Sequence, residues 1–157
     1  MLSMPRENVQ SYPRPPALEA VPQRVIIRFG GQAIADSSRA LRVLETHHAP
    51  TYYIPMTDIS ALLQPVAGQS FCEWKGVARY LDVVSGGAAA KRAAWTYDQP
   101  SKQYKLLAGH VAFYAGMMDG CFVGKEKVVP QPGDFYGGWV TSNLDGLVKG
   151  GPGTENW

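Results

Sequence analysis

Two aromatic segments in the middle of the chain hold the residues best suited to chemistry. They are Phe71–Gly76, which reads Phe-Cys-Glu-Trp-Lys-Gly, and Ala94–Tyr97, which reads Ala-Trp-Thr-Tyr. A tryptophan or tyrosine ring has a large apolar face and one polar tip, so a cluster of such rings builds either a core or a ligand pocket. We expect a pocket whose rings give apolar contact and whose lysine binds an anionic group. The expected ligand-binding residues are Tyr53, Trp74, Lys75, Trp95 and Tyr97.

Cys72 is the candidate catalytic residue. A thiolate with Lys75 nearby could act as a nucleophile or as a redox thiol. An unpaired cysteine is also common in cores, where it behaves as a small hydrophobe, and we favour this inert interpretation. Cys72 and Cys121 form no Cys-x-x-Cys pair, and the three histidines give no further sign of metal ligation. We therefore expect no metal site and no cofactor.

Strand alternation limits how this site is built. If residues 70–74 form one strand, Cys72 and Trp74 point to one face, and Glu73 and Lys75 point to the other. Trp74 and Lys75 can then line the same pocket only if the strand ends at these residues. Gly76 is compatible with such an ending.

The bulk composition indicates one globular domain. The chain has 157 residues, of which 45% are hydrophobic and 18% are charged. A net charge of +2 without a Lys/Arg run predicts no nucleic-acid partner. No apolar stretch approaches the ~20 residues that span a bilayer, so we expect no membrane association. Two cysteines and no signal-peptide pattern favour a cytoplasmic protein.

The domain organisation follows from proline, glycine and aromatic content. We expect a Pro-rich arm over residues 1–22, one domain over 23–129, and a Gly/Trp-rich tail over 130–157. The arm should be flexible or extended over the surface. Because the tail carries several large apolar side chains, it should pack on the domain or on a second subunit, which would make a homodimer.

Short apolar runs between Gly-rich turns predict an all-β, mainly antiparallel fold. Gly30-Gly31 should join two strands in a hairpin. The expected strands are 24–29, 32–36, 39–45, 52–55, 70–74, 77–84, 91–97, 111–114, 121–123 and 128–129. Short helical turns are expected at 58–63 and 102–109.

Seven blocks of the sequence resemble the domain-of-unknown-function 427 family in order and spacing. They are residues 28–32, Asp36, 39–45, 52–55, 72–76, 94–97 and 109–114, and the resemblance covers about residues 24–129. It implies a β-tent fold, in which two small antiparallel sheets pack at a steep angle. Many such domains pin the sheets with zinc on two Cys-x-x-Cys pairs, and this chain has none. The resemblance therefore implies a tent without a zinc pin.

Three functions remain open from the sequence. The leading hypothesis is a domain that binds a small molecule in an aromatic-lined pocket. The alternatives are a thiol-dependent enzyme that uses Cys72 and an interaction or dimerisation module that uses the C-terminal tail.

Overall fold

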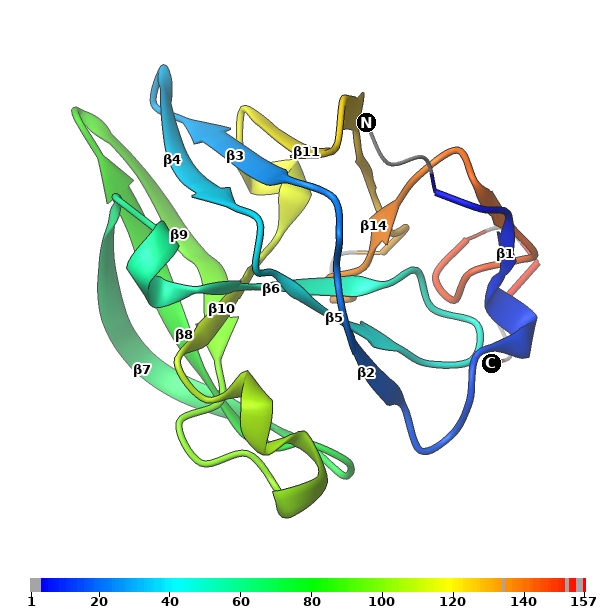
Figure 1. Cartoon of the computed structure of the whole chain (residues 1–157). Coiled ribbons are helices and arrows are strands. Elements are labelled where there is room, and N and C mark those ends of the chain that lie inside the picture. The colour runs from blue at the N-terminus through cyan, green and yellow to red at the C-terminus, as the bar shows by residue number, and fades with distance from the viewer. Residues whose placement is uncertain (1–3, 134, 152, 155–156) are drawn as a thin grey trace.

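The computed structural model describes residues 4–133, 135–151, 153–154 and 157. The chain forms antiparallel sheets joined by tight turns and short 3-10 helices (Figure 1). The expected all-β, mainly antiparallel fold is thereby confirmed. The short helices are η1 (Val9–Ser11), η2 (Met56–Asp58), η3 (Lys102–Leu107) and η4 (Ala115–Met117).

The larger sheet has seven strands in the order β2-β5-β6-β10-β9-β8-β7, and every neighbouring pair is antiparallel. One sheet is therefore larger than the two small sheets implied by the resemblance. The strands are β2 (Ala17–Ala20), β5 (Leu41–Leu44), β6 (Thr51–Pro55), β7 (Leu62–Cys72), β8 (Gly76–Ser85), β9 (Ala88–Thr96) and β10 (His110–Phe113).

The second sheet has four strands in the order β12-β11-β3-β4. They are β3 (Val25–Phe29), β4 (Gln32–Ser37), β11 (Gly120–Val123) and β12 (Glu126–Lys127). Gly30 and Gly31 join β3 to β4 with φ values of 64° and 77°, a backbone that glycine adopts without a steric penalty. The hairpin expected at this glycine pair is confirmed.

Two further sheets have only two strands each and lie near the chain ends. β1 (Glu7–Asn8) pairs in parallel with β15 (Leu144–Asp145), and β13 (Val129–Pro130) pairs with β14 (Trp139–Val140). The blue N-terminal and orange-red C-terminal segments consequently lie together at the right of Figure 1.

The two faces of the larger sheet carry different side chains because residues alternate along each strand. Tyr52 and Ile54 on β6 join a mainly aliphatic cluster that the four-stranded sheet completes with Val25 and Ile27. Tyr53, between them in sequence, joins a second cluster that is rich in aromatic rings. We call these the aliphatic face and the aromatic face of the larger sheet.

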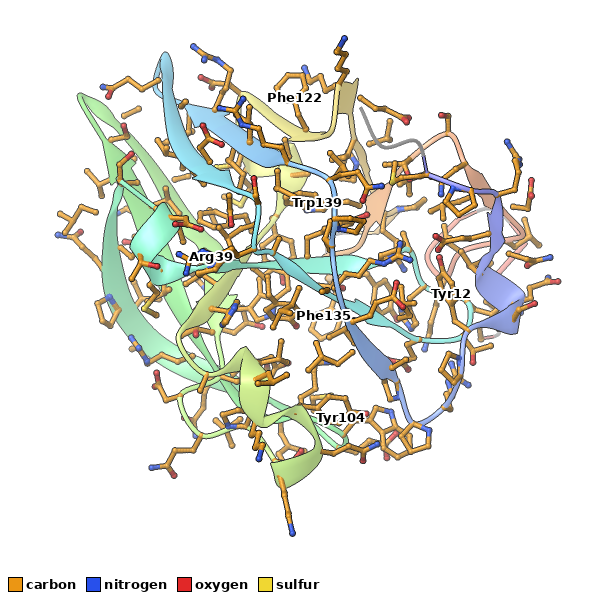
Figure 2. All side chains as sticks on the ribbon, in the orientation of Figure 1. Tyr12, Arg39, Tyr104, Phe122, Phe135 and Trp139 are labelled. Atoms are coloured by element: carbon orange, nitrogen blue, oxygen red, sulfur yellow. The ribbon has the colours of Figure 1, made fainter. Side chains whose placement is uncertain are left out.

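The tail returns to its own domain. The Trp139 side chain is 0% exposed, its ring stacks on Tyr52 with centroids 5.0 Å apart, and its Nε1 donates to the Phe113 carbonyl at 3.0 Å. Figure 2 places Trp139 in the interior of the molecule. The N-terminal segment is also part of the fold, because its strand β2 forms one edge of the larger sheet. The boundaries of arm, domain and tail stay a prediction.

Several expected elements differ in position. The helical turn expected at 58–63 is η2, which ends at Asp58, and strand β7 already begins at Leu62. Pro65 interrupts no sheet there, since β7 is the edge strand of its sheet and an edge tolerates proline. β11 pairs with residues 126–127 rather than 128–129, because the chain reverses directly after Val123, which lies opposite Glu126.

Candidate functional site

A hollow of about 640 Å³ lies on the aromatic face, and we call it the first hollow. All five residues expected to bind a ligand line it: Tyr53, Trp74, Lys75, Trp95 and Tyr97. Cys72 lines it as well. The structure therefore brings the whole predicted set together. The volume of the hollow is within the range of small-molecule pockets.

The rings come from four neighbouring strands, β6, β10, β9 and β8, or from residues directly after them. Trp95 on β9 lies opposite Tyr80 on β8, so both side chains project from the same face of the sheet. Tyr97 follows two residues after Trp95, and its ring centroid is 6.4 Å from that of Tyr53 on β6. Trp95 also contacts Tyr114, with centroids 4.6 Å apart. The spacing by two residues therefore gathers these rings into one wall.

Trp74 and Lys75 reach the first hollow from a turn. Strand β7 ends at Cys72 and β8 begins at Gly76, so Glu73, Trp74 and Lys75 are not on a strand. Strand alternation therefore does not apply to them. The strand ends before Trp74, which is the condition under which Trp74 and Lys75 can line the same pocket. Ser101 fixes the turn, because its Oγ donates to the Trp74 carbonyl at 2.5 Å and its amide donates to the Lys75 carbonyl at 2.9 Å.

Lys75 is a partly buried cation in this aromatic setting. Its Nζ lies 5.8 Å from the centroid of the Tyr97 ring, within the range of a cation–π contact. Burial alone lowers the pKa of Lys75, but Tyr53 and Cys72 attract the ammonium group, and the pKa lies above its usual value. Among the described residues, no carboxylate lies within 4.0 Å of the ammonium group. Glu45 and Glu73 also line the hollow, and Glu45 attracts the ammonium group from farther away. The hollow therefore offers an anion a cation that has no carboxylate in direct contact among the described residues.

The two cysteines have different surroundings. Cys72 is half-buried at the first hollow, and its thiol lies close enough to Lys75 to affect the lysine pKa. Cys121 is buried on the aliphatic face, where burial raises the pKa of its thiol to about 12. Both thiols are free. Cys72 is therefore the cysteine that a molecule in the hollow could contact.

The tail forms part of the wall of the first hollow. Gln131 is buried; its Oε1 accepts from the Ala49 amide at 3.1 Å, and its Nε2 donates to the Lys149 carbonyl at 2.9 Å. Nε2 also lies 3.2 Å from His48 Nδ1. Burial, together with Lys149 and other cations, lowers the pKa of His48 to about 4, so the ring is neutral at physiological pH. Gln131 thus fastens the tail to the loop before β6.

Gly137 lets the tail approach the aromatic face closely. A Cβ atom at this position would lie 2.0 Å from Cη2 of Trp95, a distance that no side chain can tolerate. We call residues 135–138 the strap, because they cross the ring of Trp95. Sequence reasoning missed the wall residues His48, Gln131, Tyr136, Gly137 and Lys149. Only the Gly137-Gly138 pair, within a segment rich in aromatic side chains, hinted at a close approach.

Over the described ranges, no three His, Cys, Asp or Glu side chains group as a metal ion would require. No helix in the part of the chain that the structure describes has the length and apolar character to cross a membrane.

Comparison with known proteins identifies the domain. No curated protein matches the chain. The model of a family described as a domain of unknown function, DUF427, matches residues 17–124, which run from β2 to the turn after β11. The matched range contains all five expected ligand-binding residues and Cys72, whereas the wall formed by the tail lies outside it. The match covers more than half of the sequence and confirms the resemblance, so the chain belongs to the DUF427 family.

Proposed function

We propose that this protein is a cytoplasmic domain that binds a small organic anion with an aromatic part. The observation that carries the proposal is Lys75 in an aromatic hollow: its ammonium group is partly buried, and no described carboxylate lies within 4.0 Å of it. Two free cysteines are consistent with a reducing compartment.

The chemistry of the walls supports an aromatic anion as ligand. Trp95 and Tyr97 line the hollow but are nearly buried, so a ligand would touch only the parts of their rings that face the hollow. Trp74 is half-buried and offers a more accessible ring for contact with a planar ligand. A carboxylate or phosphate beside Lys75 would replace its lost water with a charge-assisted hydrogen bond. Lys149 also lines the hollow, with Nζ 5.6 Å from the centroid of the Tyr136 ring, and adds a second positive charge.

The four tryptophans allow a direct test by NMR. Trp74 and Trp95 line the first hollow, whereas Trp139 is buried on the aliphatic face and Trp157 does not line the hollow. We expect biphenyl-4-carboxylate at millimolar concentration to shift the indole N–H signals of Trp74 and Trp95 and leave those of Trp139 and Trp157 in place. Biphenyl-4-carboxamide, the neutral match, should bind more weakly.

The Lys75→Met variant completes the test. It should abolish the preference for the carboxylate over the carboxamide, while Lys125→Met, at an exposed turn outside the hollow, should retain it. Equal binding of acid and amide to the wild type, or no shift at Trp74 and Trp95, would contradict the proposal. A thermal-shift screen with a metabolite library would then identify the natural ligand, because a ligand stabilises the state that it binds.

Thiol chemistry at Cys72 is a second candidate function. It is favoured by the position of the thiol beside the Lys75 ammonium group in the same hollow. An ammonium group stabilises a thiolate and so increases its reactivity. The expected result is faster alkylation of Cys72 by iodoacetamide in the wild type than in Lys75→Met. If Cys72→Ser binds every ligand from the screen unchanged and no ligand is turned over, Cys72 contributes packing only.

A further inference from the structure

A second hollow of about 660 Å³ lies next to the first. Six residues line both: Tyr80, Tyr114, Gln131, Tyr136, Gly137 and Gly138. Because these residues touch both hollows, the distance between the hollows is at most the width of one residue. The hydroxyl of Tyr114 donates to the Phe135 carbonyl at 3.1 Å and so ties the end of β10 to the strap at this junction. The two hollows are therefore neighbours on the two sides of the strap.

Arg92 brings a separate positive charge to the second hollow. It lies three positions before Trp95 on β9, and regular alternation would place the two side chains on opposite faces. Its φ of 51° and the shift of register between β8 and β9 mark a bulge at this point. The guanidinium Cζ accordingly lies 4.3 Å from the centroid of the Tyr80 ring, on the aromatic face. A non-glycine residue with positive φ is strained, and such strain clusters at functional sites.

A backbone carbonyl of β7 and the side chain of Asp82 on β8 hold Arg92 in position. Asp82 Oδ1 accepts from the Arg92 amide at 2.8 Å and holds the bulge. Nη1 donates to the Ala67 carbonyl at 2.7 Å, and a Cβ at Gly68 would lie 3.2 Å from Nη1. Gly68 has a φ of 95° beside a register shift in β7, so two irregular strands meet at this side chain. Over the described residues, no carboxylate pairs with the guanidinium group, whereas Lys91 pairs with Asp82.

We infer that the two hollows form one elongated site whose ligand carries two anionic groups, one on each side of an aromatic segment. The inference rests on the proposed function. One anionic group would lie at Lys75, and the other at Arg92, which can bind a carboxylate or phosphate through two parallel hydrogen bonds. The aromatic segment would pass along Tyr80, which lines both hollows and already stacks with Arg92.

Matched probes of increasing length test this inference by titration calorimetry. The dianions are terephthalate, biphenyl-4,4′-dicarboxylate and terphenyl-4,4″-dicarboxylate, and each is compared with the monoacid of the same ring system. At one length the dianion should bind about tenfold more tightly than its monoacid, the gain expected from one added charge-assisted hydrogen-bonded pair.

The gain should depend on Arg92. It should disappear in Arg92→Gln, return in part in Arg92→Lys, and persist in Arg79→Gln, which removes an arginine of the neighbouring strand that pairs with Asp98 outside both hollows. In each variant the dianion is compared with the monoacid on the same protein, and the urea midpoint shows that the variant is folded.

The remaining outcomes separate the two proposals. If no dianion exceeds its monoacid, or if the gain persists in Arg92→Gln, the elongated site is wrong while the first hollow still binds anions. If the monoacids do not bind in the first hollow, the proposed function itself is wrong.

Discussion

The two faces of the larger sheet come from the same strands and yet have different structures. The aliphatic face is closed by the four-stranded sheet, and Phe113 and Val111 are completely buried there. The aromatic face is covered by the strap, by Tyr104 and Leu107 of η3 and by neighbouring loops, and it keeps a hollow of about 640 Å³. A close-packed aliphatic interior gives stability, whereas rings with polar tips around a hollow can contact a ligand. We propose that the aliphatic face mainly stabilises the fold and that the open part of the aromatic face binds the ligand.

The largest effect should come from breaking the closed face. Trp139→Ala removes a ring that is completely buried and leaves the Phe113 carbonyl without its donor. We expect the free energy of unfolding to fall by about 3–5 kcal/mol, measured by urea denaturation. The matched control is Trp157→Ala, because Trp157 is 45% exposed, and its loss should cost less than about 1 kcal/mol. Equal effects of the two substitutions would contradict this assignment of the core.

A smaller effect should come from forcing the strap off the aromatic face. Gly137→Ala places a methyl group within the ring of Trp95, so the strap has to move. We expect a loss of about 1–3 kcal/mol in stability, with a shifted indole N–H signal for Trp95. Gly87→Ala is the control, because a Cβ there meets no atom within 4 Å. An unchanged Trp95 signal in Gly137→Ala would show that the strap does not rest on that ring.

The third effect depends on pH and concerns His48, which lines the hollow of the aromatic face. The pKa of His48 is about 4 in the folded protein and near 6.5 in the unfolded chain. The unfolded state therefore binds more protons between these values, and stability should fall as the pH is lowered from 6.5 toward 4.

The size of this loss should be roughly 1–2 kcal/mol after allowing for solvent near the ring. His48→Gln removes the titrating group, so its urea midpoints should decline less over the same range than those of the wild type. Parallel pH profiles for the two proteins would show that His48 is not held neutral by the tail.

Much of the fold was predictable because its signals are local. Gly30-Gly31 specifies a hairpin by its backbone conformation, and the alternation at Tyr52 and Tyr53 assigns the two faces of β6. Strand β7 was harder to predict, because Pro65 is typical of a strand end unless the strand is known to lie at an edge. Edge position is a property of the whole sheet, which no local pattern contains.

Part of the candidate site was predictable because some of its residues lie close together in the sequence, and the rest was not. Trp95 and Tyr97 could be identified by their type and spacing within one strand. Gln131 and Lys149 reach the hollow only because the tail folds back over more than eighty residues of chain to Ala49 and His48. Arg92 was hidden by its bulge, since regular alternation with Trp95 points it to the wrong face.

The most direct test of the account is to measure stability and binding together in Lys75→Met. Because burial and the attraction of Tyr53 and Cys72 oppose each other at this ammonium group, we expect the free energy of unfolding to change by less than about 1 kcal/mol. Binding of biphenyl-4-carboxylate should weaken about tenfold or more in the same sample. A protein that loses several kcal/mol of stability while it binds the carboxylate unchanged would contradict the division of the sheet into a stabilising face and a binding face.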